Sequence, residues 1–124
     1  FRLAEMYLIY AEATKLGGNG DGNMALEYVN DLRTRAYGGS TAGNITAGQL
    51  TTEFILDERA RELYWEGLRR TDLIRYNLLT TGTYLWPWKG GVPSGTAVDD
   101  KYNIFPIPAA NRTANPNLSQ NDGY

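Results

Sequence analysis

Three glutamates at four-residue intervals are the side chains of this sequence best suited to chemistry. Glu58, Glu62 and Glu66 would project from one side of a helix, and glycoside hydrolases use two such carboxylates as acid and base. Arginines stand three or four residues from acidic residues, in the pairs Arg59 with Glu62, Glu66 with Arg70, and Asp57 with Arg61. An arginine stabilises the ionised carboxylate, whereas a general acid needs the opposite. The pattern therefore favours an ion-pair network.

The residue types that are missing exclude other kinds of site. The chain of 124 residues has neither cysteine nor histidine, so Cys/His zinc sites, thiol nucleophiles and Ser-His-Asp triads are excluded. Its formal net charge of -2 gives no basic surface for nucleic acid or anionic lipid. Any catalysis would therefore have to rest on carboxylates, lysine or tyrosine. Since the glutamates are interpreted as an ion-pair network, we expect no catalytic residue, no metal site and no cofactor, in a protein that is not an enzyme.

A glycine-rich run from Gly17 to Asn23 separates two helical patterns. Phosphate-binding loops and calcium loops use the same residue types. However, no strand pattern precedes the run and no Lys-Ser/Thr pair follows it, while Met24 and Asn30 hold the positions of the EF-hand Gly and Glu. The run is therefore interpreted as a plain turn, in which Asn23 caps the next helix.

Hydrophobic periodicity predicts helices at residues 2–16, 24–37, 52–70 and 72–79, with little sheet. Thr51 is expected to cap the third helix, and Thr71 with Asp72 to start the fourth. Gly67 would lie inside the third helix above Ala60, where a neighbouring backbone approaches closely. The order of helices and turns indicates an all-α fold of TPR-like stacked helical hairpins.

The composition changes at Gly82, after which all five prolines stand among aromatic residues. Proline forbids regular helix, and aromatic side chains need burial. We expect a single domain over 1–124, with helical hairpins in 1–80 and an ordered, loop-rich tail in 81–124. Apolar Leu118 and Tyr124 are expected to fix the closing segment, residues 118–124, against the helices.

Several strings of the sequence form a pattern known from one family. The strongest runs from Glu58 to Arg75, with Glu-Arg, Glu-Gly, Arg and Asp-Leu at its characteristic points. The others are Arg2 to Ala13, Asn30 to Ala36, Phe105 to Pro108 and Asn115 to Tyr124. Together they resemble the C-terminal region of the SusD/RagB family of Bacteroidetes outer-membrane lipoproteins. Asp122 departs from the pattern, because the family often has proline there.

The resemblance implies a helical scaffold at the outer surface of the cell. It implies that the protein binds oligo- or polysaccharides for nutrient uptake through a TonB-dependent, SusC-like transporter. It also implies a fragment of a longer lipoprotein, whose signal peptide, lipid-bearing cysteine and much of the ligand surface lie outside this chain. The alternative function is a TPR-like protein-interaction scaffold without its own ligand, and a carboxylate-based glycosidase ranks third.

Exposed aromatic side chains are the groups within this chain on which sugar rings could stack. Trp86 and Trp88, with Tyr84 close by, are the candidates, and Lys89 is expected to donate hydrogen bonds to sugar hydroxyls. Pro87 stiffens the loop between the two tryptophans. The opposite interpretation, in which these rings seal the scaffold as part of its core, stays open.

Overall fold

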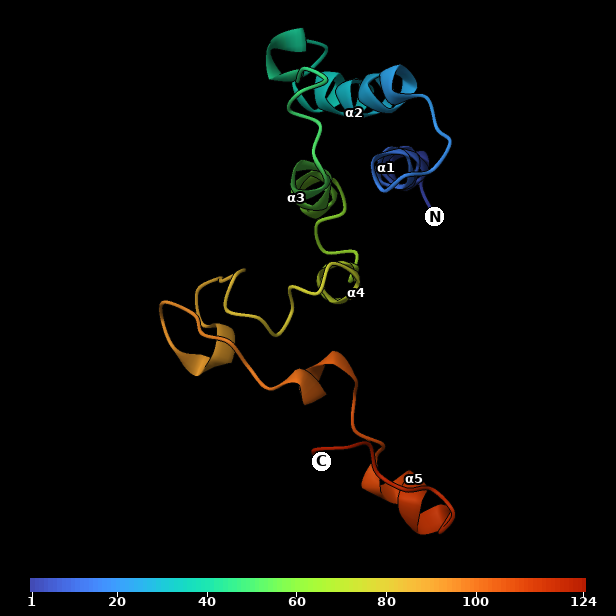
Figure 1. Cartoon of the computed structure of the whole chain (residues 1–124), viewed down its shortest axis with the longest axis vertical. Coiled ribbons are helices and arrows are strands. Elements are labelled where there is room, and N and C mark those ends of the chain that lie inside the picture. Colours follow the sequence, from blue (N-terminus) through green and yellow to red (C-terminus); the bar gives the residue numbers. More distant parts are fainter. The chain divides into compact units, whose positions relative to one another are not determined.

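The computed structural model describes all 124 residues, which form helices and loops without a β-strand. The α-helices are α1 (Leu3–Lys15), α2 (Gly22–Ala36), α3 (Thr52–Glu62), α4 (Arg69–Arg75) and α5 (Ala109–Ala114) (Figure 1). Short 3₁₀ turns lie at Thr41–Gly43, Lys89–Gly91 and Asp100–Asn103. None of the helices has both the length and the hydrophobicity needed to cross a bilayer. The all-α fold class is thus confirmed, while the TPR-like arrangement stays a prediction.

Two compact units make up the chain, unit 1 (Phe1–Arg69) and unit 2 (Arg70–Tyr124). Unit 1 contains α1, α2 and α3, and most of unit 2 is loop. The division of a single domain into helical hairpins at 1–80 and a tail at 81–124 stays a prediction.

Side-chain caps fix the starts of α2 and α3. The carboxylate of Asp21 accepts hydrogen bonds from the backbone N–H groups of Asn23 at 2.7 Å and Met24 at 3.4 Å. The predicted cap Asn23 was therefore wrong by two residues, and the acidic cap also suits the positive end of the helix dipole. The hydroxyl of Thr51 accepts from the N–H of Phe54 at 3.1 Å, so the predicted cap of α3 is confirmed.

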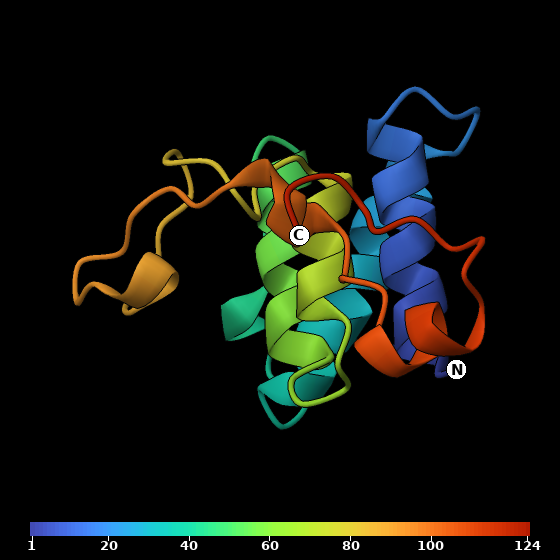
Figure 2. The same ribbon diagram turned by 90° about the horizontal axis from the view of Figure 1, so that it is seen from below.

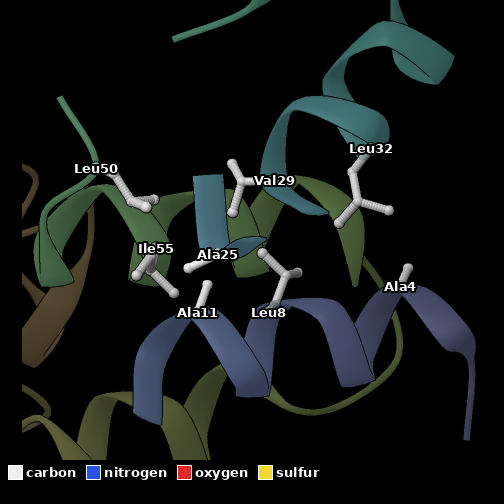
Figure 3. Close-up of a cluster of buried hydrophobic side chains, with 8 residues drawn as sticks. All are labelled: Ala4, Leu8, Ala11, Ala25, Val29, Leu32, Leu50 and Ile55. Atoms are coloured by element: carbon white, nitrogen blue, oxygen red, sulfur yellow. The ribbon is translucent and has the colours of Figure 1, made fainter. Parts of the chain in front are cut away.

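A cluster of buried apolar side chains holds the helices of unit 1 together. It combines residues of α1, of α2, of α3 and of the segment just before α3, namely Ala4, Leu8, Ala11, Ala25, Val29, Leu32, Leu50 and Ile55 (Figure 3). Leu8, Val29 and Ile55 are completely buried, and each such burial stabilises the fold by roughly 1.5–3 kcal/mol. Tyr7 of α1 also stacks on Tyr28 of α2, with ring centroids 4.2 Å apart. Packing between elements therefore fixes the three helices.

The third helix is shorter than predicted. α3 ends at Glu62, and beyond it Trp65 and Gly67 adopt left-handed backbone angles, with φ of 68° and 75°. The prediction of one helix over 52–70, with Gly67 stacked above Ala60, was therefore wrong. A Cβ atom at Gly67 would meet no atom within 4 Å, so no neighbouring backbone lies close there. Glycine suits the position because it adopts positive φ without strain.

The fourth helix begins earlier than predicted. The expected starting residues Thr71 and Asp72 lie inside α4, and the predicted span of 72–79 was wrong at both ends. Arg69, the first residue of α4, donates to the carbonyl oxygen of Leu56 at 2.8 Å and pairs with Asp57 at 3.5 Å. These two contacts, both within unit 1, fix the position of Arg69, and local capping signals do not reveal them.

In unit 2, hydrogen bonds order the loop-rich sequence. Figure 2 shows residues 80–98, in gold, as a long loop interrupted by one short turn. The hydroxyl of Tyr124 lies 3.1 Å from the carbonyl oxygen of Lys101 and 2.9 Å from that of Ile104. The ammonium of Lys101 donates in turn to the carbonyl oxygen of Gly123 at 3.0 Å. The closing segment is therefore anchored, but to the loop around Lys101, and the predicted packing against the helices stays a prediction.

Candidate functional site

An aromatic pocket lies within unit 2. Its volume is about 610 Å³, inside the range of small-molecule sites. The aromatic side chains that line it are Trp86, Trp88, Tyr102, Phe105 and Tyr124, and the charged ones are Arg70, Lys89 and Asp99. Flat apolar rings with a few polar groups around them suit a ligand that has both C–H faces and hydroxyls.

The two predicted tryptophans meet in this pocket. Trp88 is 67% exposed, whereas Trp86 is partly buried. Trp88 also has a left-handed backbone, with φ of 68°, which is a strained conformation for a bulky residue. Tyr84 does not line the pocket, but its ring lies against that of Trp86, with centroids 6.4 Å apart. The structure therefore brings Trp86 and Trp88 together and places Tyr84 as a support for Trp86.

Lys89 lines the pocket as well, but its ammonium group is used inside the protein. The residue is only 3% exposed. Its Nζ donates to the carbonyl oxygens of Leu78 at 3.3 Å and Tyr84 at 2.8 Å, and to that of Thr81. Burial lowers the pKa of Lys89 below its ordinary value, whereas the carbonyl oxygens favour the charged form. All three N–H donors of the ammonium are thus engaged, so Lys89 has none left for the predicted hydrogen bonds to sugar hydroxyls.

Two glycines let the loop fold tightly on itself. A Cβ atom at Gly95 would lie 2.6 Å from the carbonyl oxygen of Trp86, and one at Gly90 would lie 2.5 Å from Cγ2 of Thr96. The N–H of Thr96 donates to the carbonyl oxygen of Lys89 at 3.1 Å. Residues 95–96 therefore pack directly on the backbone that carries the tryptophans.

The remaining aromatic walls of the pocket come from tail residues for which the sequence predicts only packing. Tyr102 is 47% exposed, Phe105 71% and Tyr124 41%. The guanidinium of Arg70 lies over the Phe105 ring at 4.0 Å and donates to the carbonyl oxygen of Tyr102. The density of aromatic residues in the tail was a signal for these positions, but it did not indicate which rings share a pocket.

The three glutamates whose carboxylates could have served as acid and base lie in unit 1, where arginines pair with them. Glu58 binds Arg33 at 2.8 Å and Arg61 at 2.7 Å, and only 6% of its side chain is exposed. A second pocket, of about 380 Å³, is lined in part by these three side chains. The buried carboxylate of Glu58 is thus paired with two guanidinium groups, as expected of an ion-pair network.

Glu62 and Glu66 are paired with arginines from other elements. Glu62 binds Arg2 at 3.0 Å and Arg35 of α2 at 2.5 Å, while Glu66 binds Arg2 at 2.6 Å. The predicted pairing with arginine is thus confirmed, although these partners differ from the predicted ones. For Glu66 the reason is that α3 ends at Glu62, so this residue lies outside the helix whose three- to four-residue spacing predicted its partner.

Comparison with known proteins gives consistent matches along the whole chain. A family model described as the SusD family matches residues 1–124. Starch-binding protein SusD of Bacteroides thetaiotaomicron is 46% identical over 125 residues, which cover 100% of this chain and 21% of that protein. SusD-like protein P25 of Formosa agariphila is 35% identical over 124 residues, covering 98% of this chain and 23% of that protein.

A solved structure gives the same result. The crystal structure of a SusD superfamily protein from Bacteroides vulgatus matches with a TM-score of 0.67 and 31% identity, over 100% of this chain and 27% of that one. The chain therefore spans about a fifth to a quarter of the length of these relatives. The matches do not support the predicted C-terminal position of the chain within the longer protein, and that part of the prediction is withdrawn.

Proposed function

Because the chain belongs to the SusD family, as its sequence strings predicted, we propose that it is part of a protein that binds glycans for nutrient uptake. The relative from B. thetaiotaomicron is a starch-binding protein by name, which supports an oligo- or polysaccharide as the ligand class. Within this chain, the observation that carries the proposal is the aromatic pocket, in which Trp86 and Trp88 lie together.

The aromatic pocket has the two kinds of groups that sugar recognition needs. Sugar rings have C–H faces that stack on aromatic planes, and the exposed ring of Trp88 is available for such contact. Sugar hydroxyls need donors and acceptors, which the guanidinium of Arg70 and the carboxylate of Asp99 supply at the same pocket. Lys89 contributes from inside the loop and not by direct contact.

The proposal also includes the location of the whole protein and its partner in transport. It places the protein at the outer membrane through a lipid anchor outside these residues, where it passes glycans to a SusC-like, TonB-dependent transporter. Binding without catalysis is part of the proposal, and the pairing of Glu58, Glu62 and Glu66 with arginines supports it. Incubating the full-length protein with its best glycan should therefore release no reducing sugar.

The test of the aromatic pocket uses the full-length protein. A glycan array first identifies the best ligand, and calorimetric titration then compares Trp86→Ala and Trp88→Ala with the wild type. We expect each change to weaken binding by roughly tenfold, since a ring contact contributes on the order of 1 kcal/mol beyond its buried area. Trp65→Ala is the matched control, because Trp65 is 89% exposed in unit 1 and lies outside the pocket.

Two results would count against the proposal at different levels. If both pocket variants fold and bind the glycan as tightly as the wild type, the aromatic pocket is structural. If the array of the full-length protein shows no bound glycan at all, the proposed function itself is wrong.

A protein-interaction scaffold is the second candidate, favoured by the exposed apolar side chains of α1 and of Leu16, which directly follows this helix. Leu3 and Leu16 are each 66% exposed, Met6 is 42% and Ile9 is 44%. Such a surface suits burial against protein. The change Ile9→Asp distinguishes the two functions: if it abolishes co-purification with the transporter while Trp86→Ala and Trp88→Ala leave glycan binding unchanged, the scaffold function is favoured.

A further inference from the structure

The ammonium of Lys89 lies in a cage of backbone carbonyl oxygens, as a bound cation would. The oxygens belong to Leu78, Thr81 and Tyr84, and all three accept hydrogen bonds from Nζ. This part of the chain runs without helix or strand from residue 76 to residue 88. Its carbonyl groups therefore lack the regular backbone donors of a helix or sheet, although buried acceptors need a partner. The ammonium of Lys89, which has three donors and no acceptor, takes the place of these donors.

The same residue also holds Trp86 in two ways. Nζ of Lys89 lies 4.6 Å from the centroid of the Trp86 ring, close enough for a cation–π interaction. The backbone N–H of Lys89 donates to the carbonyl oxygen of Trp86 at 3.1 Å. The ammonium also binds the carbonyl oxygen of Tyr84, whose ring lies against that of Trp86, so it restrains a neighbour of this tryptophan as well.

The neighbouring backbone needs such a restraint. Trp88 and Gly90, which flank Lys89, have left-handed φ angles of 68° and 66°. A bulky residue adopts this conformation only when its surroundings enforce it. The buried ammonium is the charged group at the centre of this loop, and its removal would leave three carbonyl groups without their shared donor.

We propose that Lys89 is a positioning residue, a tethered cation that binds the carbonyl cage and holds Trp86 ready to stack on a sugar ring. Its effect on glycan affinity rests on the function proposed above. Its effect on the orientation of Trp86 does not depend on any ligand.

Fluorine NMR of the full-length protein labelled with 5-fluorotryptophan measures this orientation directly. The Trp86 resonance is identified as the one that disappears in Trp86→Phe. In Lys89→Ala we expect this resonance to shift or broaden and the affinity for the best array glycan to fall about tenfold. Lys15→Ala, which changes an exposed lysine of α1, should alter neither.

Chemical rescue distinguishes the effect of the positive charge from the effect of filling the space that the side chain occupied. n-Propylammonium replaces the part of the side chain that Lys89→Ala removes, so it should restore both the Trp86 resonance and the glycan affinity. 1-Propanol, which is similar in size but uncharged, should restore neither. If Lys89→Ala does not fold, Lys89→Met keeps the apolar stem without the charge and should give the same changed resonance.

Each outcome decides one of the two proposals. An unchanged Trp86 resonance in the lysine variant overturns the positioning role, whatever the glycan result. Equal rescue by 1-propanol overturns the role of the charge. A changed resonance with rescue in a protein that binds no glycan supports the positioning role and contradicts the proposed function. A changed resonance with unchanged affinity, where Trp86→Ala does weaken binding, contradicts the effect on sugar stacking.

Discussion

Glu58 and Glu66 both pair with arginine, but water reaches one pair far more than the other. The exposed fraction of the side chain is 6% for Glu58 and 38% for Glu66. We therefore expect Glu58→Gln to lower the free energy of unfolding by on the order of 3 kcal/mol, because it leaves arginine charge without its buried partner. Glu66→Gln should cost less than about 1 kcal/mol, since exposed ion pairs contribute little.

Urea unfolding of the two variants measures this difference. Similar losses of stability for Glu58→Gln and Glu66→Gln would contradict the role of burial. The same pair of variants also tests the absence of catalysis: sugar release by the wild type that Glu58→Gln alone abolishes would make Glu58 a catalytic residue after all.

Gly91 and Gly95 form a second matched pair of residues. Both have left-handed φ angles, 80° and 77°. A Cβ atom would meet no atom within 4 Å at Gly91, whereas at Gly95 it would lie 2.6 Å from the carbonyl oxygen of Trp86. Gly91→Ala should therefore cost only the strain of the backbone, about 1 kcal/mol. Gly95→Ala should cost more and should also weaken glycan binding, because the backbone of Trp86 has to move.

Thermal unfolding and calorimetric titration of both glycine variants check this expectation. A Gly91→Ala variant that loses as much glycan affinity as Gly95→Ala would show that backbone strain, and not the contact with Trp86, controls the pocket.

At the scale of elements, the change in stability caused by Gly67→Ala tests whether a helix continues through residue 67 or a turn lies there. Inside a helix, Gly67→Ala would stabilise the protein by about 1 kcal/mol. At the observed φ of 75° it should instead destabilise the protein by about 1 kcal/mol, although the site has room for a methyl group. A rise in the melting temperature of Gly67→Ala would contradict the observed end of α3.

The sequence predicted those elements whose signals are local. α1 and α2 follow from hydrophobic periodicity and a glycine-rich turn, and both were placed within two residues of their bounds. The end of α3 was not predicted, because Trp65 takes a left-handed conformation that its residue type disfavours. The contacts of Arg69 with Leu56 and Asp57 span 12 or more residues, and no sequence spacing reveals them.

The same limit applies to the aromatic pocket. Trp86 and Trp88 were predicted from residue type, since sugar binding favours exposed aromatic rings. Tyr102 and Tyr124 join them only because hydrogen bonds fold the end of unit 2 back onto the loop around Lys101. The burial of Lys89 depends on carbonyl groups five to eleven residues away, whose directions are set by an irregular backbone.

For the molecule as a whole, the closing segment 118–124 should be necessary for the stability of unit 2. Its removal takes away the contacts of Tyr124 with Lys101 and Ile104, and the hydrogen bond from Asn121 to the carbonyl oxygen of Phe105 at 2.7 Å. We expect the deletion to lower the melting temperature of the full-length protein and to weaken glycan binding, since Tyr124 and Phe105 line the pocket. Tyr124→Phe, which removes only the hydroxyl, should have a smaller effect, and an unchanged melting temperature after the deletion would contradict the expectation.

The enclosure of Lys89 has a consequence for covalent labelling. An amine reacts with an acylating reagent only when it is uncharged and accessible, and Lys89 meets the second condition only when the surrounding loop opens. Lys15 is exposed and has no such restriction. The acylation rate of Lys89 relative to Lys15, read from their separate peptides by mass spectrometry, therefore reports how often this loop opens. A bound glycan that closes the loop would slow the modification of Lys89 alone, so the lysine can serve as a reporter of occupancy in the unmutated protein.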